Sequence, residues 1–144
     1  MRVFFTKSLD LPSKSNLCDC NKAKTLVIYD STTANENHLK RIPKCVEVEK
    51  VSSDNPELIS KILARRGCNK VLWECGPKLA TAAIKSNCIQ EIITFIAPKI
   101  LGGENSMNPF GDFEFGEMHE IIKLSESQLS LIGDDICVKS SFKN

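Results

Sequence analysis

The chain has 144 residues, 42% of them hydrophobic, and a formal net charge of +1. This length suits one domain with a buried core over residues 1–144, and the composition excludes an intrinsically disordered chain. Without an excess of positive charge, and with no apolar run near the ~20 residues that cross a bilayer, we predict neither nucleic acid nor a membrane as a partner. The N-terminus lacks the apolar core of a signal peptide, so we expect a soluble protein of the cytoplasm.

Seven cysteines are scattered along the chain, and only Cys18 and Cys20 are close in sequence. No CxxC pair occurs, and His38 and His119 are far from these two cysteines, so we predict no metal site. For a cytosolic protein this pattern favours reduced thiols over a disulfide or metal framework. Three cysteines border or occupy apolar segments and are expected to be small buried hydrophobes: Cys68, Cys88 and Cys137.

The first half of the chain predicts strands separated by polar segments. Apolar or alternating residues predict strands over 2–6, 25–29 and 46–49, the last half-exposed and near a sheet edge. A long polar loop over 7–24, which includes Ser13, and a short helical or irregular piece over 37–42 connect them. A strand that begins almost at the first residue suggests that the chain starts inside a larger architecture.

A helix is predicted to begin after Asn55, which suits the cap position before Pro56. Its apolar face consists of residues at helical spacing, and Gly67 ends it after two arginines. The members of the apolar face are Leu58, Ile59, Ile62 and Leu63.

The most informative stretch is 71–80, where a predicted strand over 71–73 leads into a helix that runs from Pro77 to about residue 86. Gly76 has no side chain to cover the free amides of the first helical turn, and such a turn binds anions. Glu74 lies at the carboxyl end of the predicted strand, where open α/β sheets place their ligands. On this turn alone, an ordinary strand-to-helix connection with a solvated Glu74 remains the alternative.

The remaining elements complete a mixed α/β pattern. The nearly all-apolar segment 92–97 predicts a central strand covered on both faces. A loop containing Asn105 and Met107 follows, and Gly133 and the two aspartates after it predict the turn of a C-terminal antiparallel hairpin. We therefore expect a mixed sheet flanked by helices.

Several stretches, in this order, resemble one family. The first of them is Trp73-Glu74-Cys75-Gly76-Pro77-Lys78-Leu79-Ala80. It is followed by Ile89–Ile93, by Ile96-Ala97-Pro98-Lys99-Ile100-Leu101-Gly102-Gly103 and by Gly133-Asp134-Asp135-Ile136. They look like the C-terminal reductase domain of the bifunctional riboflavin-biosynthesis deaminase/reductase. Residues 2–12 are similar to a further stretch of that family, a strand that leads into a Leu-Pro loop.

This resemblance implies a dihydrofolate-reductase-like fold whose first strands are missing, a homodimer, and NADPH as cofactor. The implied reaction reduces the ribosyl side chain of 5-amino-6-(5-phosphoribosylamino)uracil to the ribityl form. The implied cofactor residues are Gly76, Pro77, Lys78, Leu79, Ala80 and Thr81 for the diphosphate, and Thr6, Lys7 and Ser8 for the adenosine ribose and its 2′-phosphate. The resemblance implies that Glu74 faces the pyrimidine substrate, and we assign no catalytic residue.

The sequence departs from the family at two positions. Cys75 stands where the family has a glycine, and Lys7 replaces a small hydroxyl residue, a change that either favours NADPH or is a solvated lysine. The strands and substrate-gripping residues that precede position 2 in the family are absent from this sequence. The alternative is therefore a truncated, non-catalytic nucleotide-binding or dimerisation module of the same fold.

Three other groups have two interpretations each. Gly102-Gly103 forms either a phosphate loop or the turn after a strand, and Asp134-Asp135 either binds a metal or, as we prefer, forms a turn. The aromatic group of Phe110, Phe113 and Phe115, with Met107, either packs a long loop on the core or makes a subunit contact.

Overall fold

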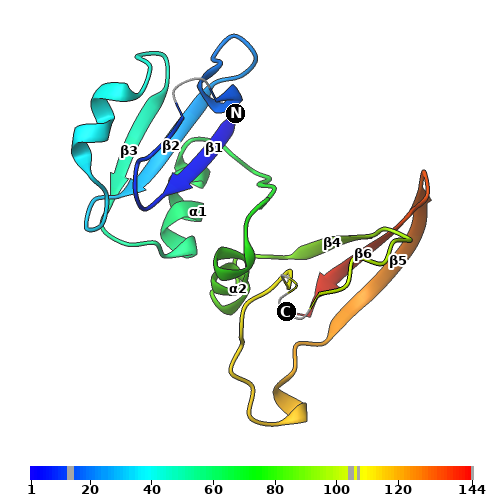
Figure 1. Ribbon diagram of the computed structural model, residues 1–144. Helices are drawn as coiled ribbons and strands as arrows, with labels where there is room; N and C mark the ends of the chain where they lie inside the picture. Colours follow the sequence, from blue (N-terminus) through cyan, green and yellow to red (C-terminus); the bar gives the residue numbers. More distant parts are fainter. Residues whose placement is uncertain (13–14, 104–105, 107, 144) are drawn as a thin grey trace. The chain divides into compact units, whose positions relative to one another are not determined.

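The structure is a computed structural model that describes residues 1–12, 15–103, 106 and 108–143. The chain divides into two compact units, Met1–Gly67 and Cys68–Asn144, which we describe one at a time (Figure 1). The predicted loop residues Ser13, Asn105 and Met107 lie outside the described residues. Over the described part of the chain, no helix has both the length and the apolar character needed to span a bilayer.

The first unit is built on a parallel sheet of three strands in the order β1-β2-β3. The strands are β1 (Arg2–Thr6), β2 (Thr25–Asp30) and β3 (Glu47–Val51), so all three predicted strands of this half are confirmed. Val48 of β3 is 40% exposed, which agrees with the predicted half-exposed edge strand. The parallel pairing places the three carboxyl ends at one edge of the sheet.

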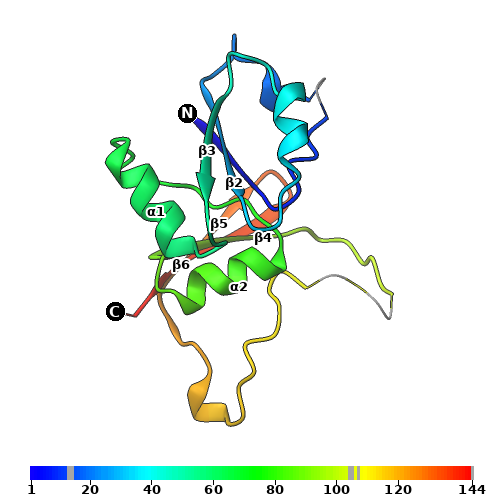
Figure 2. The ribbon, with the colours of Figure 1, turned by 90° about the vertical axis from the view of Figure 1, so that its left-hand side faces the viewer.

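Every residue of β2 is buried because the central strand is covered on both faces. Val27 and Tyr29 pack with Leu9 and Val46 in one cluster, to which the residues around η2 (Glu36–Arg41) also belong. Figure 2 shows η2 on one side of this sheet and α1 (Pro56–Arg65) on the other. Successive side chains of a strand point to opposite faces of the sheet, so β2 contributes apolar side chains both to the face covered by η2 and to the face covered by α1.

The boundaries of α1 follow the predicted cap chemistry. The Asn55 side chain accepts a hydrogen bond from the Glu57 amide at 2.9 Å, and Pro56 occupies the first turn. Ile59, Ile62 and Leu63 are buried, which confirms the predicted apolar face for these three residues. After the helix ends, Arg66 donates hydrogen bonds to the carboxylates of Glu47 and Glu49 on β3.

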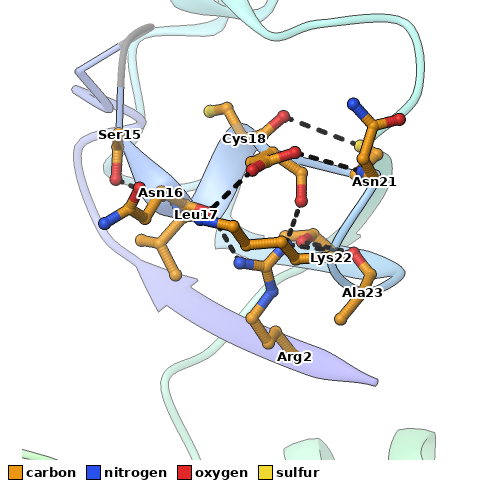
Figure 3. Close-up of polar contacts among 11 residues, drawn as sticks. Arg2, Ser15, Asn16, Leu17, Cys18, Asn21, Lys22 and Ala23 are labelled. Atoms are coloured by element: carbon orange, nitrogen blue, oxygen red, sulfur yellow. Dashed lines mark hydrogen bonds and ion pairs between the residues drawn. The ribbon is translucent and has the colours of Figure 1, made fainter.

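The long β1–β2 loop is held by one arginine at its base. The Arg2 guanidinium donates to the backbone carbonyls of Asn16, Asp19 and Ala23, as Figure 3 shows. These bonds anchor the loop around the short helical turn η1 (Asn16–Cys18). Charge-assisted hydrogen bonds of this kind are stronger than neutral ones, so Arg2 fixes a segment that is otherwise irregular.

The expectation that all cysteines are reduced is wrong for one pair. A disulfide joins Cys20 to Cys45, whose Cα atoms are 6.2 Å apart. The two residues are 25 positions apart in sequence, so no local motif marks them. They meet because Cys20 packs against the cluster of Leu9, Val27, Tyr29 and Val46, and Cys45 directly precedes Val46. Of the cysteines predicted to be buried, Cys137 is buried, whereas Cys68 and Cys88 are only partly so.

The second unit contains α2 (Pro77–Lys85) and an antiparallel sheet in the order β4-β6-β5. Its strands are β4 (Glu91–Ile96), β5 (Leu124–Ile132) and β6 (Asp135–Phe142), with η3 (Met118–Glu120) in the long loop before β5. The terminal hairpin is confirmed, and its turn begins at Gly133 with a φ of +61°. That left-handed backbone conformation favours glycine.

Two strand predictions in this half are wrong. β4 is an edge strand, with Phe95 58% exposed, because β6 of the hairpin pairs on both sides and so takes the central place. Residues 71–73 form no strand, since none of the described strands of either sheet pairs with them. Leu72 is accordingly 81% exposed. One parallel and one antiparallel sheet with few helices nevertheless confirm the predicted mixed α/β class.

Candidate functional site

The carboxyl edge of the parallel sheet collects polar residues from three chain segments. The amide of Ser31, which follows β2, donates to the carbonyl of Val51 at the end of β3, with a separation of 2.8 Å. The Thr33 hydroxyl donates to the carbonyl of Lys7, just after β1, at 3.0 Å. The segments that leave the three strands are therefore bonded to each other. Ligands of open α/β sheets bind at this kind of edge.

The buried side chain of Thr6 holds the turn after β1 in place. Its hydroxyl oxygen accepts hydrogen bonds from the amides of Ser8 at 3.2 Å and Leu9 at 3.1 Å. Leu9 has a φ of +57° and is only 1% exposed, so its burial holds this uncommon conformation in place. Thr6 is itself buried. The residues of the turn that a ligand can reach are thus Lys7 and Ser8, which are both exposed.

Lys7 forms an ion pair with Asp54, which lies in the segment between β3 and α1. The ammonium nitrogen is 2.5 Å from Oδ2 of Asp54. The hydrogen bond to Asp54 raises the pKa of the Lys7 ammonium, and the negative charge of Asp30 at the end of β2 adds to this rise. The same hydrogen bond lowers the pKa of the Asp54 carboxyl. Lys7 therefore stays charged and is partly neutralised by its own chain.

The second predicted group lies at the start of α2. Gly76 is the N-cap residue and, among the described residues, no side chain caps this helix. A Cβ atom placed on Gly76 would meet nothing within 4 Å, so there is open space beside the cap. The Ala80 amide is bonded to the Gly76 carbonyl at 3.0 Å. The amides of Lys78 and Leu79 precede it in the turn where helix N–H groups have no intrahelical acceptor.

Thr81 has a different position from the other residues of this group. It is buried, and its hydroxyl oxygen accepts a hydrogen bond from the amide of Gly111 at 2.8 Å. The Gly111 amide also lies 3.3 Å from the carbonyl of Pro77. Thr81 and Pro77 thus hold the loop that includes Gly111 against the first turns of α2. Thr81 fastens this loop to the helix, whereas Lys78 on the first turn is exposed.

The two residues before Gly76 lie in an irregular segment. Glu74 is exposed, whereas Cys75 is partly buried, and burial raises the pKa of its thiol. A raised pKa disfavours the thiolate, so Cys75 behaves as a small packing residue rather than a reactive thiol.

The structure brings the predicted residues together in two groups, one per unit. Thr6, Lys7 and Ser8 form one turn of the first unit, and Gly76 to Thr81 form the start of α2 in the second. That both groups bind one dinucleotide stays a prediction. The residues that the sequence did not single out are Asp54, Thr33 and Gly111, and no local motif marks them, because each acts through a contact with a distant segment.

Two other sequence candidates lie in the second unit. Asp134 lies in the hairpin turn and Asp135 begins β6, and both line an open hollow with Pro98 and Lys99. Across the part of the chain that the structure describes, no three His, Cys, Asp or Glu residues are grouped to hold a metal ion. Gly102 and Gly103 both have positive φ, a conformation that favours glycine, and both interpretations of this pair stay open. Phe113 stacks on Phe115 with ring centroids 5.2 Å apart, and the Lys85 ammonium of α2 lies 6.0 Å from the centre of the Phe113 ring.

Comparison with known proteins identifies relatives over nearly the whole chain. The model of the RibD C-terminal domain family matches residues 1–138. The chain is 35% identical over 137 residues to the riboflavin biosynthesis protein PYRR, chloroplastic, of Arabidopsis thaliana, a match that covers 95% of this chain and 23% of that protein. It is 27% identical over 108 residues to the 2,5-diamino-6-ribosylamino-4(3H)-pyrimidinone 5′-phosphate reductase of Archaeoglobus fulgidus, which covers 74% of this chain and 48% of that protein.

A solved structure has the same fold. Acinetobacter baumannii RibD, form 2, superposes with a TM-score of 0.78 at 18% sequence identity, covering 99% of this chain and 37% of that one. The predicted dihydrofolate-reductase-like class is thereby confirmed. The chain spans between about a quarter and a half of the length of the two curated relatives it matches here.

Proposed function

The chain belongs to the RibD C-terminal domain family, and we propose from this that it takes part in an NADPH-dependent reduction in riboflavin biosynthesis. The proposed reaction converts the ribosyl side chain of 5-amino-6-(5-phosphoribosylamino)uracil to the ribityl form. The observation that carries the proposal is a family match over residues 1–138, within which a charged lysine stands at the carboxyl edge of a parallel sheet.

In this proposal the adenosine 2′-phosphate of NADPH binds at the turn after β1. The Lys7 ammonium provides the charge, and the Ser8 hydroxyl is the exposed donor next to it. Thr6 acts through the backbone, because its oxygen holds the amides of Ser8 and Leu9. A phosphate monoester suits a lysine and a hydroxyl at a strand end.

The start of α2 fits a diphosphate. The open space beside Gly76 permits close approach, and the first-turn amides of Lys78 and Leu79 point along the helix axis, where the dipole favours negative charge. Leu79, Ala80 and Thr81 contribute by packing the first turns of the helix. When bound, the nicotinamide supplies a hydride to the open or imine form of the sugar, while the protein supplies position.

Glu74 is the proposed substrate contact. It is exposed, and it lies two residues before the helix cap. A carboxylate there can accept hydrogen bonds from sugar hydroxyl groups or from the pyrimidine amino group.

Cofactor titration tests the proposal. We expect the purified chain to bind NADPH, and Lys7→Gln to weaken NADPH binding about tenfold while NADH binding changes little, because the lost charge faces the 2′-phosphate. Lys44→Gln is the matched control, since Lys44 is also exposed and precedes the amino end of β3. Failure of the unmodified chain to bind NADPH at millimolar concentration would remove the cofactor proposal.

Turnover separates the two candidate roles. Loss of NADPH absorbance in the presence of the pyrimidine substrate indicates a reductase. Cofactor binding without turnover would favour the alternative, a non-catalytic nucleotide-binding or dimerisation module.

Two further parts of the proposal concern the state of the protein. The family resemblance implies a homodimer, which we retain. Location in the cytoplasm is also retained as a proposal, although the Arabidopsis relative is named as chloroplastic.

A further inference from the structure

The Lys7–Asp54 ion pair spans the carboxyl edge of the parallel sheet. Lys7 follows β1 and Asp54 comes after β3, so the pair joins segments from the two outer strands, with β2 between them. Both side chains are more than half exposed, at 59% and 52%. The pair is therefore open to solvent and to any ligand that approaches this edge.

The backbone beneath Lys7 is held firmly, whereas its side chain is not. The Lys7 carbonyl accepts from Thr33, and the next two amides donate to Thr6. Apart from its contact with Asp54, the Lys7 side chain is mostly exposed to solvent. The ammonium can therefore exchange one anionic partner for another without any change in the fold.

The Lys7–Asp54 ion pair affects which dinucleotide binds at this edge of the sheet. This inference rests on the proposed NADPH function. A 2′-phosphate that binds Lys7 must replace the carboxylate that already pairs with it. A dinucleotide with a free 2′-hydroxyl does not need the ammonium and leaves the pair intact. We propose that Asp54 determines cofactor preference by competing with the 2′-phosphate for Lys7, which holds the affinity for NADPH below the value that Lys7 alone would give.

The stability of the fold does not depend on this pair. Exposed ion pairs contribute little to folding because water and salt screen them. Asp54→Asn keeps the size of the side chain and removes its charge. We therefore expect a folded variant in which the change shows in ligand binding.

The experiment is calorimetric titration of NADPH and NADH into the unmodified chain and Asp54→Asn at low salt. We expect Asp54→Asn to bind NADPH about three- to fivefold more tightly, with less than a twofold change for NADH. Glu57→Gln is the matched control. Glu57 lies three residues after Asp54 and forms another exposed carboxylate–lysine pair, with the Lys61 ammonium 2.6 Å from its Oε1. This control is expected to change neither affinity.

A second background tests the competition itself. In Lys7→Gln, adding Asp54→Asn is expected to leave NADPH affinity unchanged, because there is no ammonium left to release. An equal gain in both backgrounds would mean general charge repulsion and would overturn the competition. Unchanged or weaker NADPH binding by Asp54→Asn, with normal binding by the unmodified chain, overturns this inference alone. If the unmodified chain binds neither cofactor, both the proposed function and this inference, which depends on it, are wrong.

Discussion

At the scale of single residues, the hydrogen bond between Thr81 and Gly111 provides a direct test of how the second unit is held together. Thr81 is 6% exposed and accepts the Gly111 amide at 2.8 Å. We expect Thr81→Val to lower the free energy of unfolding by about 1 kcal/mol, because the partly buried Gly111 amide loses its better acceptor. The Pro77 carbonyl, 3.3 Å from the same amide, limits the loss.

Urea unfolding followed by the fluorescence of Trp73, the single tryptophan of the chain, measures this change. Thr81→Ser keeps the hydroxyl and is the control. Faster hydrogen exchange at the Gly111 amide should accompany the loss in the valine variant. A valine variant as stable as the unmodified chain would show that the bond contributes nothing.

At the scale of elements, the short helix η3 should depend on pH through Glu120. Oε2 of Glu120 accepts from the amides of Glu117 at 2.9 Å and Gly116 at 2.6 Å. The hydrogen bond from the Glu117 amide has the largest effect, followed by that from the Gly116 amide, and both lower the pKa of the Glu120 carboxyl below its ordinary value of 4.5. The stabilising contribution is therefore complete above pH 4.5 and is lost as pH falls through the lowered value.

Glu120→Gln checks the sign of this effect. The amide side chain keeps an acceptor oxygen and loses the charge. We expect its urea midpoint to lie below that of the unmodified chain at pH 7 and to match it at low pH, where Glu120 is protonated. Carbon-detected NMR titration of Glu120 gives the pKa directly, and a value at or above 4.5 would contradict the assignment.

The disulfide Cys20–Cys45 is the second prediction at this scale. The 25-residue separation corresponds to about 3.5 kcal/mol of stabilisation in the chain-entropy description. Replacing both cysteines by serine should lower the stability of the first unit by about that amount. Tyr29, the single tyrosine, is buried in the cluster that Cys20 joins, so its near-ultraviolet signal reports the loss. Cys18→Ser leaves the disulfide in place and should have little effect.

At the scale of the whole molecule, the antiparallel sheet offers a face for the proposed homodimer. Leu129 and Leu131 of β5 are opposite Val138 and Ile136 of β6, so their side chains share one face. Leu129 is 71% exposed and Leu131 is 76% exposed. Contiguous exposed apolar side chains of this kind mark interaction sites.

Leu131→Glu tests this face because it places a charge on an exposed position. We expect the dimer dissociation constant to rise at least about tenfold, since the glutamate would be buried without a partner. Sedimentation velocity over a concentration series measures it. Ser130→Glu adds the same charge on the opposite face of β5 and is the matched control. An unmodified chain that stays monomeric at high micromolar concentration would refute the proposed dimer.

The sequence by itself determined those elements whose signals are local. The strands β1 and β2 follow from apolar stretches, and β3 follows from alternating valine and glutamate. Helix α1 begins where Asn55 and Pro56 supply a cap and a first turn. The β5–β6 hairpin follows from Gly133, which adopts the positive φ its turn requires. The start of α2 was also predicted, because Pro77 suits the first helical turn and Gly76 precedes it as the cap.

Only the tertiary structure decided what depends on contacts between distant segments. Sheet order set β4 at an edge of its sheet, and residues 71–73 pair with none of the described strands, although they are apolar enough to form one. The Cys20–Cys45 bond and the Lys7–Asp54 pair join residues 25 and 47 positions apart. Pairing of this kind carries no periodic signal, since each partner is an ordinary loop residue until the fold brings the other beside it.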